Sequence, residues 1–158
     1  MNGTDPKVKL VIMNIVVSNL NKKHRIDEKF IEKIVAIILK ILKKSSNTKL
    51  EIVFLSDNVI KPLNKRYKGA NCATDVLSFD LGSCGQILIS SDMALRNSRV
   101  FNTPLEKELV LYVIHGILHL LGYDDEKPKD RSRMFRKQDS ILEMLCAKIS
   151  LSKVLMRR

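Results

Sequence analysis

Two of the chain's three histidines, His115 and His119, stand four residues apart. In a helix this spacing places both imidazoles on one face, one turn apart, as two histidines must be to share one tetrahedral metal ion. The pair alone is a weak signal, because apolar helices also carry histidines that hydrogen-bond to the backbone of the core. The residues that follow the pair decide between these interpretations.

A glycine and two aspartates follow the second histidine. Gly122 comes three residues after His119, where a helix can end in a turn that no side chain obstructs. The chain can then fold back and present Asp125 to the imidazoles, in the H-x-x-x-H-x-x-G-x-x-(H/D) spacing of metzincin-like sites; Asp124 is an alternative third ligand. Two histidines and a carboxylate leave one position of a zinc ion open to water, so the sequence predicts a zinc site of the catalytic kind, with one ion per chain.

The residue directly after the first histidine argues against one class of enzyme. A metalloprotease with this helix motif needs a glutamate there as general base, and the chain has Gly116. A peptidase is therefore disfavoured. Tyr112 and Glu108 lie one and two turns before His115 on the same face, where each is either a hydrogen-bond partner of the site or an ordinary helix position.

The sequence around these residues resembles that of a known family. The stretch His115–Asp125 looks like the H-G-x-L-H-L-x-G-Y-D-H signature of the bacterial YbeY family. The segment Leu63–Phe79, which includes Tyr67 and the run TDVLSF, is similar to the family's second motif, and Gly85–Ile87 resembles its G-D-I hairpin. Length, element order and spacing agree, so the resemblance covers nearly the whole chain.

This resemblance implies a single α+β domain over residues 1–158 with the activity of a zinc-dependent, single-strand-specific endoribonuclease. The family acts in the cytoplasm on ribosomal RNA, in maturation of the 3′ end of the small-subunit RNA and in ribosome quality control. The implied metal ligands are His115, His119 and Asp125, and the implied catalytic residues are Lys68 and the two histidines. The implied partners are ribosomal RNA and the small ribosomal subunit, with no DNA expected.

Four positions depart from the family pattern. Asp125 stands where the family has histidine, which still suits zinc but adds a negative charge that makes metal-bound water less acidic. Lys68 stands for an arginine and keeps the charge without the bidentate geometry toward a phosphate. Gln86 replaces the hairpin aspartate, and Ala73 replaces a common proline. These changes bear on catalysis more than on the fold.

The elements that must position these residues follow from hydrophobic periodicity and turn signals. We expect strands over Lys9–Val17, Leu50–Leu55, Val76–Phe79 and Gln86–Ser90, the last two as a hairpin. We expect helices over Asp27–Lys44, from Ser56-Asp57-Asn58 to Tyr67, over Asp92–Ser98 with Ser90 or Ser91 as cap, from Thr103 to about Leu121, and over Met134–Leu145.

The helix with the clearest start and stop signals carries the two histidines. Thr103-Pro104-Leu105-Glu106 predicts a capping box that opens it, and Gly122 closes it. The irregular order of strands and helices, with one hairpin, predicts an α+β fold in which one mixed sheet of four to five strands packs against helices. The metal site then lies at the end of a long helix, and the basic tail after Ser150 is expected to fray.

Composition limits the classes of protein to consider. The chain is 45% hydrophobic and 28% charged, as in an ordinary globular protein, and it has no apolar run near the ~20 residues of a membrane span. The first ten residues lack the apolar core of a secretory signal, so we expect a cytoplasmic protein. Cys72, Cys84 and Cys146 fit neither a disulfide framework nor a cysteine zinc cluster, and we expect reduced thiols with at least one in the core.

The net charge of +11 favours a polyanionic partner, although a solvated basic surface would serve solubility alone. With no tryptophan and 5% aromatic residues, recognition of the nucleic-acid backbone fits better than a base-stacking platform. Metal-assisted phosphodiester hydrolysis is the first functional hypothesis. A ribosome-associated factor with a structural zinc is the second, and a metal hydrolase of another substrate is the third.

Overall fold

The computed structural model describes residues 14–44 and 49–157. In chain order the strands and helices are β1 (Ile15–Asn19), α1 (Glu28–Ile41), β2 (Lys49–Leu55), α2 (Asp57–Lys68), β3 (Val76–Asp80), β4 (Cys84–Ser90), α3 (Ser91–Val100), α4 (Leu105–Leu120), α5 (Pro128–Lys148) and the 3-10 turn Leu151–Lys153. The part of the predicted first strand before residue 14 lies outside the described residues.

The strands form one mixed sheet in the order β1-β2-β4-β3. β1, β2 and β4 run parallel, and β3 pairs antiparallel with β4, so the predicted hairpin is confirmed. The mixed α+β sheet is confirmed as well, with four strands in the described part of the chain.

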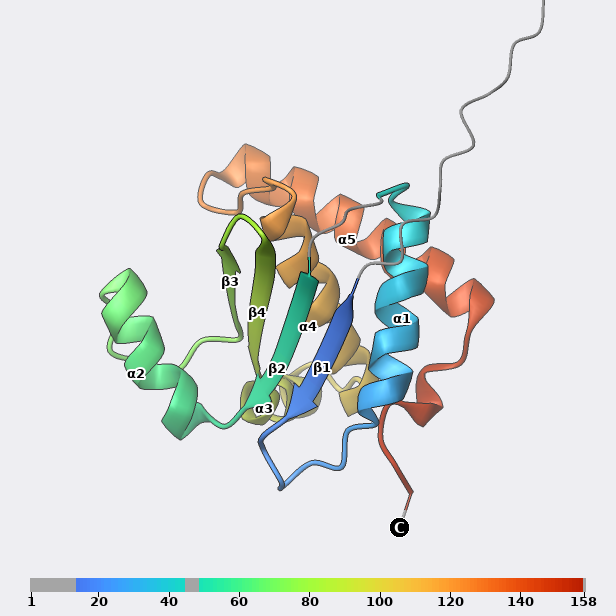
Figure 1. Cartoon of the computed structure of the whole chain (residues 1–158), viewed down its shortest axis with the longest axis horizontal. Helices are drawn as coiled ribbons and strands as arrows, with labels where there is room; N and C mark the ends of the chain where they lie inside the picture. The colour runs from blue at the N-terminus through green and yellow to red at the C-terminus, as the bar shows by residue number, and fades with distance from the viewer. Residues whose placement is uncertain (1–13, 45–48, 158) are drawn as a thin grey trace, which may run out of the picture.

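The side chains of β2 alternate between two apolar layers. Ile52 and Phe54 join the main core, which the buried faces of α1, α4 and α5 complete. Val53 and Leu55 point to the other face, where Ile60 of α2 packs with them. Figure 1 shows α4 behind the sheet and α2 beside β3. The helix with the histidines is therefore held against the sheet by its buried side.

Two expectations about the helices are wrong. Thr103 does not cap α4: the N-cap residue is Pro104, and the Thr103 hydroxyl donates instead to the buried Glu108 carboxylate at 2.8 Å. The helix α5 begins at Pro128, six residues before the expected Met134. Its first turns are polar and expose their side chains to solvent, so they lack the apolar periodicity on which the prediction depended.

The end of the chain is also ordered where fraying was expected. Val154 is fully buried, its carbonyl accepts a hydrogen bond from the Asp27 backbone at 2.8 Å, and Leu155 forms a bridge with Ile26. Tertiary packing against the start of α1 therefore outweighs the basic composition of this tail.

Ser90 caps α3 by accepting from the Met93 backbone, as expected. The three cysteines are free thiols, but none is buried, because Cys72 and Cys146 are exposed and Cys84 is half-buried. No helix in the described ranges is both long and apolar enough to cross a membrane.

Candidate metal centre

The last turns of α4 carry the two histidines side by side. The Nε2 atoms of His115 and His119 lie 3.0 Å apart, and the rings are nearly perpendicular, at 82° with centroids 4.6 Å apart. The i, i+4 spacing brings them to one face of the helix. The opposite face of α4 is packed into the core, so the imidazole positions are fixed by the helix.

The chain then turns back at a glycine. Gly122 follows the C-cap with φ +93°, a conformation that a residue with a side chain adopts only with strain. The loop returns Asp125 to the histidines, with its Oδ2 atom 3.4 Å from His115 Nε2 and 3.6 Å from His119 Nε2. The Asp124 carboxylate instead accepts from the Glu126 backbone at 3.0 Å. The structure therefore brings Asp125, and not Asp124, to the histidine pair.

The three ligand atoms have the spacing of one face of a metal tetrahedron. With zinc–ligand bonds of 2.0–2.2 Å, neighbouring ligand atoms in a tetrahedron lie about 3.3 Å apart. The three distances of 3.0, 3.4 and 3.6 Å bracket that value. The side chains of His119 and Asp125 remain 27% and 36% exposed, so solvent reaches the group. These residues fit a metal ion bound by three protein ligands with a position left for water.

Hydrogen bonds fix the protonation of both rings. His119 Nδ1–H donates to the Tyr123 carbonyl at 3.1 Å, and His115 Nδ1–H donates to Oε1 of Gln138 in α5 at 3.0 Å. In the neutral tautomer with the proton on Nδ1, the Nε2 atom of each ring is an acceptor, and both Nε2 atoms lie within 3.6 Å of the Asp125 carboxylate. Three electron-rich atoms in contact need a cation to stabilise them, which is the chemistry of a metal site.

The electrostatics keep His119 in its neutral form. Burial lowers the pKa of His119 most, and the neighbouring His115 lowers it further, while Asp125 acts in the opposite direction. A neutral imidazole is the form that binds a metal.

Glu108 and Tyr112, the two α4 residues considered as partners of the site, form hydrogen bonds with other residues. Glu108 is bound to Thr103, and the Tyr112 hydroxyl pairs with the Asn97 amide, with burial raising the pKa of Tyr112 to about 12. The partner of His115 is Gln138, which the sequence did not indicate, because it lies 23 residues further along in α5. The helix expected over Met134–Leu145 already contained Gln138, but no signal in the sequence indicates that this helix packs against α4.

The structure also explains the residue after His115. A Cβ atom on Gly116 would lie 2.5 Å from Cγ2 of Ile87 and 3.2 Å from Cγ1 of Val76, both in the sheet. The Gly116 carbonyl accepts a hydrogen bond from Ser78 in β3 at 3.1 Å. α4 is thus in such close contact with the sheet that a protease-type glutamate has no room at this position.

Lys68 is the last residue of α2 and is exposed. Gly69 ends that helix with φ +74°, and the preceding Tyr67 packs edge-on against Phe79 of β3 with ring centroids 5.0 Å apart. Besides burial and His115, the Lys68 charge also lowers the pKa of His119. Lys68 is therefore an exposed cation whose charge acts on His119, and its role stays a prediction, as do the ligand roles of the other three residues.

The departures at Gln86 and Ala73 have separate places in the fold. The Gln86 amide donates to Glu51 on the neighbouring strand at 3.0 Å, away from the histidines. Ala73 packs against the apolar layer beneath α2. Neither position is part of the metal group.

Comparison with known proteins bears on this site as a whole. The family model described as Endoribonuclease YbeY matches residues 16–146, which include Lys68, His115, His119 and Asp125. A protein named Endoribonuclease YbeY from Desulforamulus reducens is 34% identical over 149 residues, covering 84% of this chain and 97% of that protein. One of the same name from Bdellovibrio bacteriovorus is 34% identical over 149 residues, covering 87% and 99%.

A solved structure is also similar to this chain. The solution structure of the Thermotoga maritima protein TM1509 is 34% identical, covers 85% of this chain and 90% of its own, and superposes with a TM-score of 0.62. These matches confirm the resemblance drawn from the two motifs. They support an endoribonuclease role and with it the predicted class of enzyme, a hydrolase.

Proposed function

Because this chain belongs to the endoribonuclease YbeY family, we propose that it is a zinc-dependent, single-strand-specific endoribonuclease. Its role is maturation of the 3′ end of the small-subunit ribosomal RNA and ribosome quality control. The observation that carries the proposal is the convergence of His115, His119 and Asp125 on one point open to solvent.

The cofactor is one zinc ion per chain. Its ligands are the Nε2 atoms of His115 and His119 and Oδ2 of Asp125, a nitrogen and oxygen set that suits zinc. When bound, the ion polarises a phosphoryl oxygen and lowers the pKa of its water toward neutrality. The carboxylate ligand moderates that effect through its negative charge.

The residues around the ion divide the remaining work. Tyr123 and Gln138 accept the Nδ1 protons and so keep the Nε2 atoms of both imidazoles aimed at one point. Lys68, exposed at the end of α2, binds a phosphate oxygen of the RNA and places the scissile phosphodiester beside the ion. Because Lys68 is exposed at the end of α2, it engages the RNA without a conformational change of the core.

The basic surface beside the site supports an RNA partner. The first turns of α5 and the residue before them expose six cations, namely Lys127, Lys129, Arg131, Arg133, Arg136 and Lys137. Their charges bind the RNA backbone through release of its counterions. We propose ribosomal RNA within the small subunit as the partner and the cytoplasm as the compartment, with DNA not expected as a substrate.

One observation favours a second function, a ribosome-associated factor with a structural metal. Arg131 of α5 donates to the backbone carbonyls of Asp125 at 3.0 Å and Glu126 at 3.3 Å, so the loop of the third ligand is tied to that helix. A metal would strengthen the same link between α4 and α5, with or without catalysis.

The experiment that separates the two functions compares RNA cleavage by three proteins. Zinc-loaded wild type, His115→Ala and Lys68→Ala are incubated with small-subunit RNA that carries an unprocessed 3′ end, and with the same region annealed to a complementary strand. We expect wild type to cut the single-stranded form, His115→Ala to lose at least about a hundredfold in rate, and Lys68→Ala to lose less. Equal cleavage by wild type and His115→Ala would assign the activity to a contaminant and leave the structural role.

A further inference from the structure

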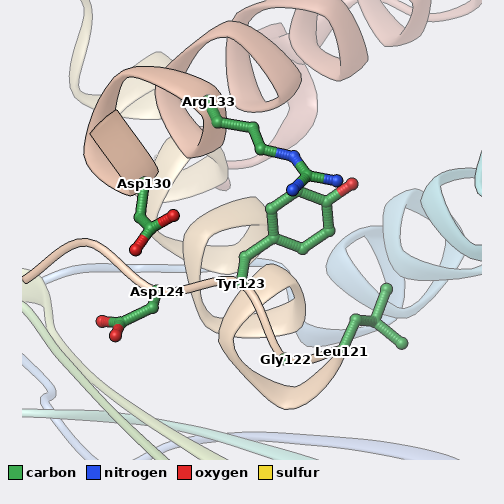
Figure 2. A pocket seen from close by; sticks show the side chains of 6 residues that line it. All are labelled: Leu121, Gly122, Tyr123, Asp124, Asp130 and Arg133. Atoms are coloured by element: carbon green, nitrogen blue, oxygen red, sulfur yellow. The ribbon is translucent and has the colours of Figure 1, made fainter. Parts of the chain in front are cut away.

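A pocket lies beside the loop that carries Asp125. It has a volume of about 340 Å³, and its walls come from the end of α4 and the start of α5 (Figure 2). The residues that line it are Leu121, Gly122, Tyr123, Asp124, Asp130 and Arg133. Asp124, which lines the pocket, directly precedes Asp125 in the sequence, so the pocket adjoins the metal group.

One wall of the pocket is planar. The Arg133 guanidinium lies over the Tyr123 ring, 5.9 Å from its centroid, as Figure 2 shows. Tyr123 is itself packed against the main core, so the guanidinium rests on a supported surface. Planar arginine and aromatic groups of this kind are the surfaces on which unstacked RNA bases lie.

The opposite wall is acidic. Figure 2 shows Asp130 above Asp124, both to the left of the Tyr123 ring, with the Asp124 carboxylate turned away from that ring. One oxygen of Asp124 accepts from the Glu126 backbone, whereas Asp130 makes no hydrogen bond or ion pair with residues 14–44 and 49–157. With two carboxylates and one guanidinium, the lining carries a net negative charge in a chain of net charge +11. The carboxylates of this pocket attract N–H donors.

Guanine is the RNA base whose Watson–Crick edge offers two adjacent N–H donors, at N1 and N2. A carboxylate with two free oxygens is the complementary acceptor for that edge. Uracil offers one donor between two acceptors, and adenine and cytosine each place a ring-nitrogen acceptor beside the amino group. We propose that this pocket binds an unpaired guanine of the RNA, with the Asp130 carboxylate accepting from its N1 and N2 groups and the Arg133 guanidinium stacking on its face. The proposal rests on the proposed function in that the base belongs to an RNA substrate.

The test measures binding and not cleavage. Isotope-labelled, zinc-loaded full-length protein is titrated separately with the 5′-monophosphates of guanosine, inosine, adenosine and uridine, with inorganic phosphate, and with Mg²⁺ alone. The backbone amide signals of Gly122, Tyr123 and Asp124 report on the pocket. Inosine differs from guanosine only in lacking the N2 amino group, and phosphate alone accounts for binding at the zinc ion.

We expect the guanosine nucleotide to shift these signals saturably, with a Kd at least about fivefold lower than the inosine and uridine nucleotides. Asp130→Asn removes that advantage, because an amide presents a donor where guanine needs an acceptor. Asp139→Asn, with the same charge change at an exposed position of the same helix, leaves it intact.

Equal Kd values for the four nucleotides, or the same shifts with phosphate alone, would overturn the guanine pocket. Saturation of these signals by Mg²⁺ alone would also overturn it and identify a cation site. Since no RNA is cut in these titrations, an inactive enzyme that still prefers guanosine would refute the endoribonuclease function and leave the pocket standing.

Discussion

The aspartate at position 125 differs most from the family pattern and yet completes the group. Its Oδ2 atom lies within 3.6 Å of both histidine Nε2 atoms, where a histidine would place a neutral nitrogen. The carboxylate compensates part of the metal charge. Substitution of Asp125 is therefore a direct test of the proposed set of metal ligands.

We predict that Asp125→Ala weakens zinc binding by a hundredfold or more, because it removes one of three protein ligands. Asp124→Ala, a neighbouring substitution with the same charge change, leaves zinc affinity within about threefold, since that carboxylate bonds to the Glu126 backbone. Competition with a chelator of known affinity measures both. Full zinc retention by Asp125→Ala would move the third ligand elsewhere.

Gln138 acts on the metal through His115. Its Oε1 atom accepts the Nδ1 proton and fixes the ring orientation. We predict that Gln138→Leu lowers zinc affinity about 10- to 100-fold, the usual effect of removing such a partner. Gln138→Glu keeps an acceptor and retains affinity. If leucine and glutamate variants bind zinc alike, the hydrogen bond has no orienting role.

Gly116 is required by close packing. We predict that Gly116→Ala lowers the free energy of unfolding by about 1–3 kcal/mol, because its Cβ would approach Ile87 to 2.5 Å. Urea unfolding of Gly116→Ala, Ile87→Ala and the double variant tests this. The Gly116→Ala cost should shrink in the Ile87→Ala background, and an unchanged cost would place the strain elsewhere.

At the scale of elements, the sequence predicts the sheet better than it predicts the ends of helices. Strand runs such as Leu50–Leu55 and the glycine turn before β4 have local signals, and both were confirmed. The first turns of α5 have no apolar periodicity, because Lys129 to Arg133 are all polar or charged, so their helical state depends on Pro128 and on packing against α4.

The candidate site was predictable only in part, because some of its residues come from a separate helix. His115, His119, Gly122 and Asp125 lie within eleven residues of sequence and follow helix and turn rules. Gln138 and Arg131 reach the site from α5, and contacts between separate elements have no local signal. The ordered C-terminal tail likewise depends on a distant partner, Ile26.

A polar cluster at the carboxyl ends of β2 and β4 predicts how stability varies with pH. Burial alone would raise the pKa of Asp57, but hydrogen bonds from Arg96 and Ser90 outweigh it, so this pKa is lowered. The Asp92 carboxylate behaves in the same way, with burial opposed by donors that include the Asp57 backbone and Asn21. A carboxyl whose pKa is lowered in the folded state stabilises above its unfolded pKa, about 4, and that contribution is lost as pH falls below it.

We therefore predict that Asp57→Asn lowers the free energy of unfolding more at pH 7 than at pH 3, where wild type has lost part of the contribution. Urea unfolding at both pH values measures the difference, and Asp139→Asn, an exposed carboxylate, serves as control. The same loss for Asp57→Asn at pH 7 and pH 3 would show that charge is not the stabilising factor.

At the scale of the whole molecule, the net charge of +11 and the metal group point to the same kind of substrate. The exposed cations at the start of α5 lie beside the loop that carries Asp125, so the surface that attracts a polyanion adjoins the group that would cut it. Composition predicts the charge, but only the fold shows that it adjoins the site.

The most direct test of the account removes the metal and returns it. Purified protein is stripped with a chelator, its zinc content is measured, and cleavage of single-stranded small-subunit RNA is followed as zinc is added back. We predict that stripped protein is inactive and that activity rises linearly to a plateau at about one zinc per chain, while Asp125→Ala shows no recovery under the same conditions. Undiminished RNA cleavage by protein free of metal would contradict the account.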